Sequence, residues 1–152
     1  MLVRILQNET FLTVLSGVIV FVLGQIYLEN VIRPNSRFRD LKAKIACDLI
    51  FYADRYSNPL DLEETYVENT REHYKQAGEG LRKLAAEIQG FIEIRRWYNF
   101  SIPEDKDLHS VSRNLIGLSN SLWCYRVHGR DIWQENIDMV REIRELLDIE
   151  TD

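Results

Sequence analysis

Residues 11–28 read FLTVLSGVIVFVLGQIYL, eighteen positions with no charged side chain and one strongly polar one, Gln25. As an α-helix that rises about 1.5 Å per residue, this stretch is about 27 Å long, close to the hydrocarbon thickness of a bilayer. The pattern predicts a transmembrane helix. The alternatives are a cleaved secretory signal and a buried core helix. A signal would follow a basic segment and end at small residues, and a core helix would carry a polar face.

Basic residues are distributed unequally on the two sides of this stretch. One arginine, Arg4, precedes it, whereas five cations follow it closely: Arg33, Arg37, Arg39, Lys42 and Lys44. Lysine and arginine next to a membrane span are retained on the cytoplasmic side. We therefore expect a single-pass protein of a bacterial inner membrane, with its N-terminus outside and its C-terminal body in the cytoplasm.

Small residues recur every seven positions along the stretch, at Thr10, Gly17 and Gly24, with Ser16 beside the first glycine. A stripe of small residues lets two helix backbones approach closely in lipid. We expect a homo-oligomer whose seam contains Ser16, Gly17, Gly24 and Gln25. The alternatives are that the glycines reflect the general composition of membrane helices and that Gln25 lies near the headgroups.

The composition of the 152 residues limits the remaining possibilities. The chain is 45% apolar and 28% charged with only 3 prolines, which predicts one folded, helix-compatible domain and excludes a two-domain enzyme or a wholly disordered chain. Its net charge of −5 argues against general coating of nucleic acid. We find no cysteine–histidine ligand spacing and no phosphate-binding glycine loop, so we predict no metal, no cofactor and no enzymatic activity.

Apolar residues at spacings of three and four predict four helices after the membrane span. Pro34-Asn35-Ser36 interrupts the pattern, with Ser36 as a helix cap, and Gly78-Glu79-Gly80 predicts a kink or a break in the second helix. The predicted helices cover residues 36–56, 62–98, 106–125 and 132–147. Their core stripes include Phe38, Leu41, Ile45, Leu49, Tyr52 and Tyr56; Leu81, Leu84 and Ile88; Leu108, Val111, Leu115, Leu118 and Leu122; and Trp133, Ile137, Val140, Ile143 and Leu147.

The fold class is therefore predicted to be all-α: a single N-terminal transmembrane helix followed by a cytoplasmic up-and-down bundle of four to five helices. The expected divisions are residues 1–30 for the N-terminal segment and span, 31–35 for a linker, 36–149 for the bundle and 150–152 for a tail. Alternation of helix direction returns the end of the second helix to the bilayer. Residues expected at the membrane interface are Arg33, Arg37, Arg39, Arg95, Arg96 and Trp97. The alternative for the last three is that Trp97 closes the bundle end while the arginines are solvated.

One segment of the third predicted helix suggests chemistry. Residues 112–120 read SRNLIGLSN, in which Arg113 and Asn114 stand together and further polar residues, Ser119 and Asn120, follow on an otherwise apolar helix. The alternative for Arg113 is an ordinary surface pair with a carboxylate such as Glu104 or Asp107. The polar residues would suit a subunit interface or an aqueous pore.

This segment resembles the arginine–polar motif of HEPN-type helical bundles, through Arg113 and Asn114. In the ribonuclease members of that family an arginine and a histidine act on a scissile phosphate, but this chain has Leu118, Ser119 or Asn120 where the family has histidine. The resemblance implies a HEPN-like bundle without the usual acid–base group. Membrane-anchored relatives accompany RNA-targeting CRISPR and other antiviral systems and assemble into pores.

We expect a membrane-anchored protein that self-associates and alters membrane permeability or acts as a scaffold, in antiviral defence. Its expected partners are the lipid bilayer, further copies of itself, and an RNA-targeting defence protein or RNA. The alternative is a tethered HEPN-like module that binds or processes RNA.

Overall fold

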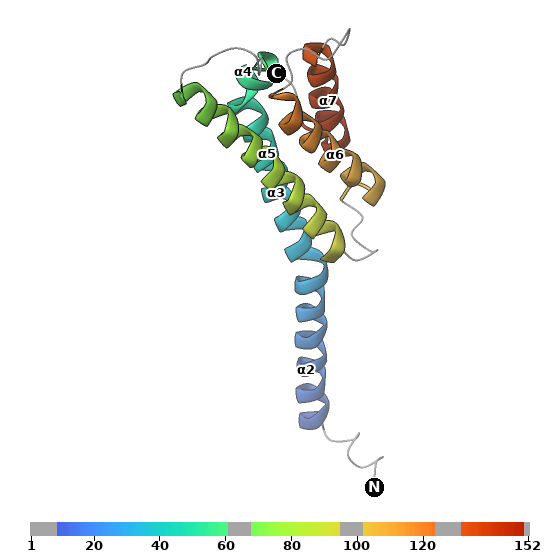
Figure 1. Ribbon diagram of the computed structural model, residues 1–152. Helices are drawn as coiled ribbons and strands as arrows, with labels where there is room; N and C mark the ends of the chain where they lie inside the picture. The colour runs from blue at the N-terminus through green and yellow to red at the C-terminus, as the bar shows by residue number, and fades with distance from the viewer. Residues whose placement is uncertain (1–8, 61–67, 95–101, 124–131, 151–152) are drawn as a thin grey trace.

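The computed structural model describes residues 9–60, 68–94, 102–123 and 132–150, and these ranges are helical with short connectors and no strand. Their elements, in chain order, are α2 (Glu9–Tyr27), the π-helical turn η1 (Leu28–Ile32), α3 (Arg33–Phe51), α4 (Ala53–Ser57), α5 (Glu68–Ile94), α6 (Asp105–Ser121) and α7 (Ile132–Leu147). Figure 1 shows α2 projecting as a single helix from a compact group formed by the other helices. The predicted all-α class is confirmed for these residues.

The predicted interruption after the apolar stretch is wrong. α2, η1 and α3 form one uninterrupted helix over Glu9–Phe51, so residues 31–35 are helical and Ser36 is not an N-cap. Proline is tolerated here because it is the second residue of α3, close after the wide turn η1, at whose end the Arg33 N–H bonds to the Leu28 carbonyl five residues back. Asn35 also donates from Nδ2 to the Val31 carbonyl at 2.7 Å.

The bundle helices alternate in direction, as predicted. Phe38 of α3 stacks near Phe91 of α5, with ring centroids 5.7 Å apart, whereas Tyr74 at the other end of α5 donates to the Asn58 carbonyl just beyond α4. α5 is therefore antiparallel to α3. Its last residue, Ile94, comes back to the junction of η1 and α3.

The predicted core is largely confirmed. Buried apolar side chains of α3, α5, α6 and α7, with Leu122 at the end of α6, form one cluster. It includes Phe38, Leu41, Ile45, Leu49, Leu81, Leu84, Ile88, Leu108, Val111, Leu115, Leu118, Val140, Ile143 and Leu147. The first turn of α7 differs from the prediction: Trp133 is half exposed, and Ile132 and Asn136 are buried instead. Asn136 is buried because its Nδ2 donates to the Tyr56 carbonyl at 2.6 Å, a bond that fixes α7 to α4.

Of the kink or break predicted at Gly78-Glu79-Gly80, the break is wrong, because α5 continues through these residues. These glycines instead allow neighbouring helices to approach. A Cβ on Gly80 would lie 2.8 Å from the Tyr52 hydroxyl oxygen, and one on Gly78 would lie 3.4 Å from Ser119 Oγ. The local cost of glycine in a helix is offset by close packing against α3 and α6.

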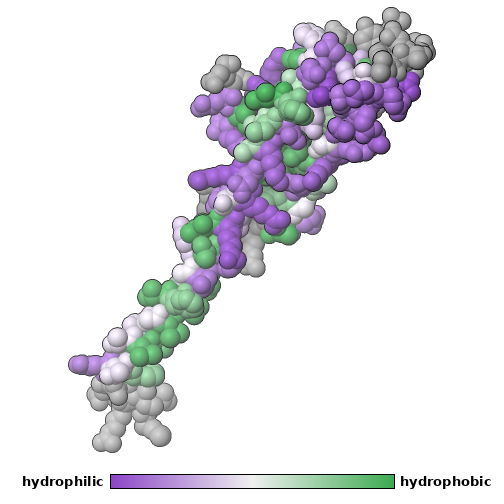
Figure 2. Space-filling view, turned by 90° about the vertical axis from the view of Figure 1, so that its left-hand side faces the viewer, coloured by the Kyte–Doolittle hydropathy of each residue, from purple (hydrophilic) through white to green (hydrophobic). Residues whose placement is uncertain are grey.

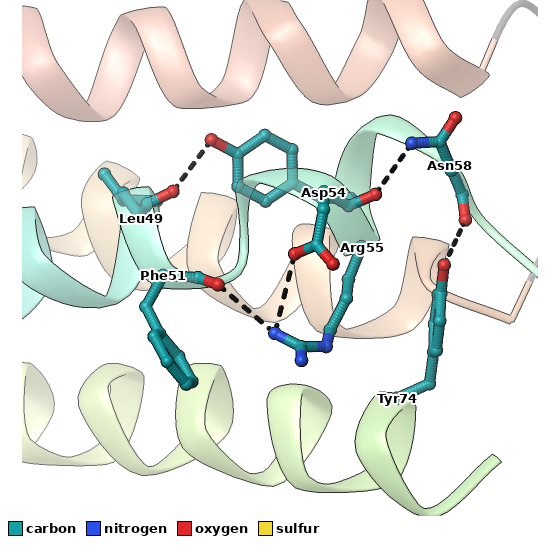
Figure 3. Close-up of polar contacts among 7 residues, drawn as sticks. Leu49, Phe51, Asp54, Arg55, Asn58 and Tyr74 are labelled. Carbon is teal, nitrogen blue, oxygen red and sulfur yellow. Dashed lines mark hydrogen bonds and ion pairs between the residues drawn. The ribbon is translucent and has the colours of Figure 1, made fainter. Parts of the chain in front are cut away.

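The first predicted bundle helix is divided in two at Tyr52, where the backbone leaves the helical region before α4 begins. Figure 3 shows the polar contacts that hold this corner. The Tyr56 hydroxyl donates to the Leu49 carbonyl at 2.9 Å, and the Tyr74 hydroxyl donates to the Asn58 carbonyl at 2.6 Å. Two tyrosines therefore satisfy carbonyls that the end of a helix leaves without intrahelical partners.

Candidate functional site

The surface of α2 is the largest unexplained feature of the described residues. None of the helix is buried against the bundle, and its apolar side chains remain open on every side, among them Val14 (62% exposed), Val20 (69%), Phe21 (66%) and Leu23 (59%). Figure 2 shows the apolar surface along this helix, in contrast to the largely hydrophilic surface above it. It is long and apolar enough to span a membrane.

All four residues of the predicted oligomer seam lie on this exposed helix. A Cβ added at Gly17 or Gly24 would meet nothing within 4 Å, so neither glycine serves packing within one chain. Ser16 donates from its hydroxyl to the Thr13 carbonyl at 2.9 Å, and Gln25 is exposed. The seam is available to a second helix, and its use in self-association remains a prediction.

The predicted interface arginines divide into three groups. Arg33 forms an ion pair with Glu29, four residues earlier, and is therefore charge-compensated. Arg37 and Arg39 are exposed and form no hydrogen bond or ion pair within the described ranges. Arg95, Arg96 and Trp97 lie outside the described residues. Cationic side chains therefore surround the start of α3, just beyond the apolar helix.

The polar residues of α6 connect it to α5. Ser119 donates to the Gly78 carbonyl at 2.9 Å and accepts from Arg82 Nε at 3.0 Å, while the Arg82 guanidinium also donates to Asn120 Oδ1 at 2.9 Å. Ser112 likewise donates to the Ala85 carbonyl. Ser119 and Asn120, which suggested a subunit interface or a pore, are therefore hydrogen-bonded within one chain.

Arg113 and Asn114 are not brought together. Arg113 is exposed and pairs with neither Glu104 nor Asp107, so the surface ion pair considered above is absent from the described part of the chain. Asn114 is half-buried, and its Nδ2 has no partner among the described residues. The two residues of the motif therefore have separate surroundings.

Arg113 instead lines a groove of about 660 Å³ between α5 and α6. Lys106 and His109 of α6 and Gln89 of α5 share this groove. The Gln89 amide nitrogen lies 3.3 Å from His109 Nδ1, within hydrogen-bond distance. Lys106 is paired with Glu104 at 2.9 Å, so Arg113 and the His109 ring are the groups that could bind an anion such as a phosphate.

His109 was not predicted as part of this site, although the spacing of four residues before Arg113 was visible. The HEPN-type motif places its histidine after the arginine, whereas His109 precedes Arg113, and the contribution of Gln89 depends on packing between two helices. Comparison with protein-family models, curated proteins and solved structures found no match to this chain.

Proposed function

We propose that this protein is a single-pass membrane protein that self-associates and, as an assembly, alters membrane permeability or acts as a scaffold at the membrane. The observation that carries the proposal is the uncovered apolar surface of α2. Each large apolar side chain left in water forgoes about 1.5–3 kcal/mol of burial free energy, so a helix with none of its residues buried requires lipid or other chains around it.

The charge distribution supports an orientation with the bundle in the cytoplasm. Five cations lie between residues 33 and 44. Arg37 and Arg39 form no ion pair with any described residue, so their charges can interact with lipid headgroups. A bacterial inner membrane is the proposed location. The resemblance to membrane-anchored HEPN-like proteins supports a role in antiviral defence.

Self-association is proposed because one helix per chain cannot enclose an aqueous path. The open backbone at Gly17 and Gly24 supports close helix contact there. Such an assembly needs no catalytic group, and the proposed activity is not enzymatic.

Replacement of both Gly17 and Gly24 by leucine is expected to weaken self-association about tenfold or more, because the added side chains separate the backbones. The measurement is the particle size of the full chain in mild detergent, together with dye release from vesicles. Val22→Leu with Ile26→Leu, on the opposite face of α2, is the matched control and should retain both properties. A wild-type particle that is monomeric and a vesicle that stays sealed would contradict the proposal.

A second candidate is a tethered module that binds or processes RNA, favoured by the shared groove of Lys106, His109 and Arg113. On this hypothesis, Arg113→Ala should lower affinity for a single-stranded RNA oligonucleotide about tenfold and reduce the salt dependence of binding by about one phosphate contact. Electrophoretic mobility titrations at several salt concentrations measure both. Arg71→Ala, at an exposed position near the start of α5, is the control. Wild-type protein that does not bind RNA would rule this candidate out.

A further inference from the structure

A cleft lies between α3 and α5 at the end of the bundle nearest to α2. It consists of two adjoining cavities, of about 250 and 770 Å³, that share Arg37, Phe91 and Ile94. The smaller one extends toward Glu29 and Arg33, next to the apolar helix, and the larger one extends along α3 past Asp40. The larger cavity has the size of a small-molecule site, about 300–1,000 Å³.

Most charges of this cleft neutralise one another. Arg33 pairs with Glu29, and Lys44 pairs with Glu87 at 3.0 Å. Burial and the Glu87 carboxylate raise the pKa of the neighbouring Asp48, while Lys44 lowers it, so Lys44 lies under the influence of two carboxylates. The Lys44 ammonium group is therefore already paired within the protein.

Arg37 and Asp40 are different, because neither forms a hydrogen bond or ion pair with any described residue. Both line the larger cavity. They are three residues apart on α3, a rise of about 4.5 Å with the two side chains on neighbouring positions of one helix face. Within the described residues, the cleft thus offers one cation and one anion, side by side, that have no partner.

The order of Arg37 and Asp40 along α3 places the cation closer to the proposed bilayer than the anion. Arg37 is nearer to α2, and side chains of a helix tilt toward its N-terminus, which here directs the guanidinium toward the proposed bilayer. Asp40 lies one step farther away. In an aminophospholipid the phosphate is attached to the glycerol on the membrane side, and the ammonium extends beyond it. The charges of such a headgroup have the same order as Arg37 and Asp40.

The wall provided by α5 suits the apolar part of a lipid. Phe91 is buried against Phe38, whereas Ile94 remains 57% exposed although it lines both cavities. A Cβ added at Gly90 would meet nothing within 4 Å, so the wall is open there. An acyl chain rising from the bilayer would cover Ile94.

We propose that this cleft binds a zwitterionic aminophospholipid, phosphatidylethanolamine, with Arg37 on its phosphate and Asp40 on its ammonium group. This inference rests on the proposed function, because it requires α2 to lie in the membrane. An anionic lipid without an amine, such as phosphatidylglycerol, would bring no cation to Asp40, and phosphatidylcholine has no N–H to donate to it. The cleft should therefore select phosphatidylethanolamine over both.

The test is competitive lipid retention by the full chain. Protein reconstituted into vesicles of equal parts phosphatidylethanolamine, phosphatidylglycerol and phosphatidylcholine is extracted in mild detergent, and its bound lipid is identified by native mass spectrometry. Wild-type protein is expected to retain phosphatidylethanolamine preferentially. Arg37→Gln should lower retention of that lipid about tenfold, as should Asp40→Asn, through loss of a charged hydrogen bond.

Asp40→Asn also has a signature that a merely structural effect would not produce. Because it removes an anion beside Arg37, it should shift the preference toward phosphatidylglycerol. Arg71→Gln and Glu79→Gln, at exposed positions of α5 that line neither cavity, are the matched controls. Equal retention of the three lipids, or unchanged selectivity in both cleft variants, overturns the lipid proposal while membrane insertion stands. A protein that does not insert into the vesicles overturns the proposed function and this inference together.

Discussion

Val20→Arg is expected to remove the protein from the membrane fraction. Val20 is 69% exposed and lies near the middle of the uncharged stretch 11–28, where an arginine has no nearby headgroup to reach. An arginine at the centre of a membrane span costs about 3 kcal/mol on an insertion scale, or about a hundredfold in the insertion equilibrium. Alkaline carbonate extraction of cell membranes, followed by immunoblotting, measures the fraction that remains integral.

If α2 lay in water instead, the same substitution would have little effect on the protein. At an exposed position of a soluble protein, Val20→Arg would change the free energy of unfolding by only about 0.5 kcal/mol and would improve solubility. Val20→Leu is the control, because it preserves the apolar character and should leave the protein integral. A Val20→Arg protein that resists carbonate extraction as wild type does, or a wild-type protein recovered without detergent, would contradict membrane anchoring.

Periodicity was the sequence signal that best predicted the fold. Residues 38, 41, 45 and 49 repeat at helical spacing, and all four are buried in the common core. The bounds predicted for the last helix, 132–147, agree with α7. These elements were predictable because their pattern records the same burial that stabilises the bundle.

Local breaker residues were less informative, because tertiary packing and a single wide turn overrode them. Pro34 lies inside a continuous helix after η1, and Gly78 and Gly80 lie inside α5. In both places a residue that is unfavourable in an isolated helix is accommodated by its surroundings. The hydroxyl of Tyr52 near Gly80 could not have been inferred from the chain alone, since Tyr52 follows the end of α3 and Gly80 lies in α5.

The candidate sites were predictable only in part, for a related reason. Sequence alone indicated Arg33, Arg37 and Arg39 as a cationic group, but their partners distinguish them. Glu29 neutralises Arg33, whereas Arg37 lies beside Asp40 and forms no ion pair with any described residue. Likewise, Arg113 was indicated, but the groove it shares with Gln89 requires α5 to lie against α6. The sequence identifies which side chains are charged, but whether a charged side chain can bind a ligand depends on its neighbours in the folded protein.

Leu115→Ala is expected to lower the free energy of unfolding of the bundle by about 3 kcal/mol, through lost burial and the cavity left behind. Leu115 is fully buried on α6, and the adjacent Ile116 is 44% exposed, so Ile116→Ala is a matched control with a much smaller expected effect. Urea titration of the full chain in mild detergent, followed by circular dichroism, measures both. Similar losses in the two variants would contradict the assigned face of α6.

Because α2 contributes no side chain to this core, Leu115→Ala should leave carbonate resistance unchanged, and Val20→Arg should leave the unfolding of the bundle unchanged. We expect each substitution to change only one of the two measured quantities, because lipid stabilises the apolar helix and internal packing stabilises the bundle.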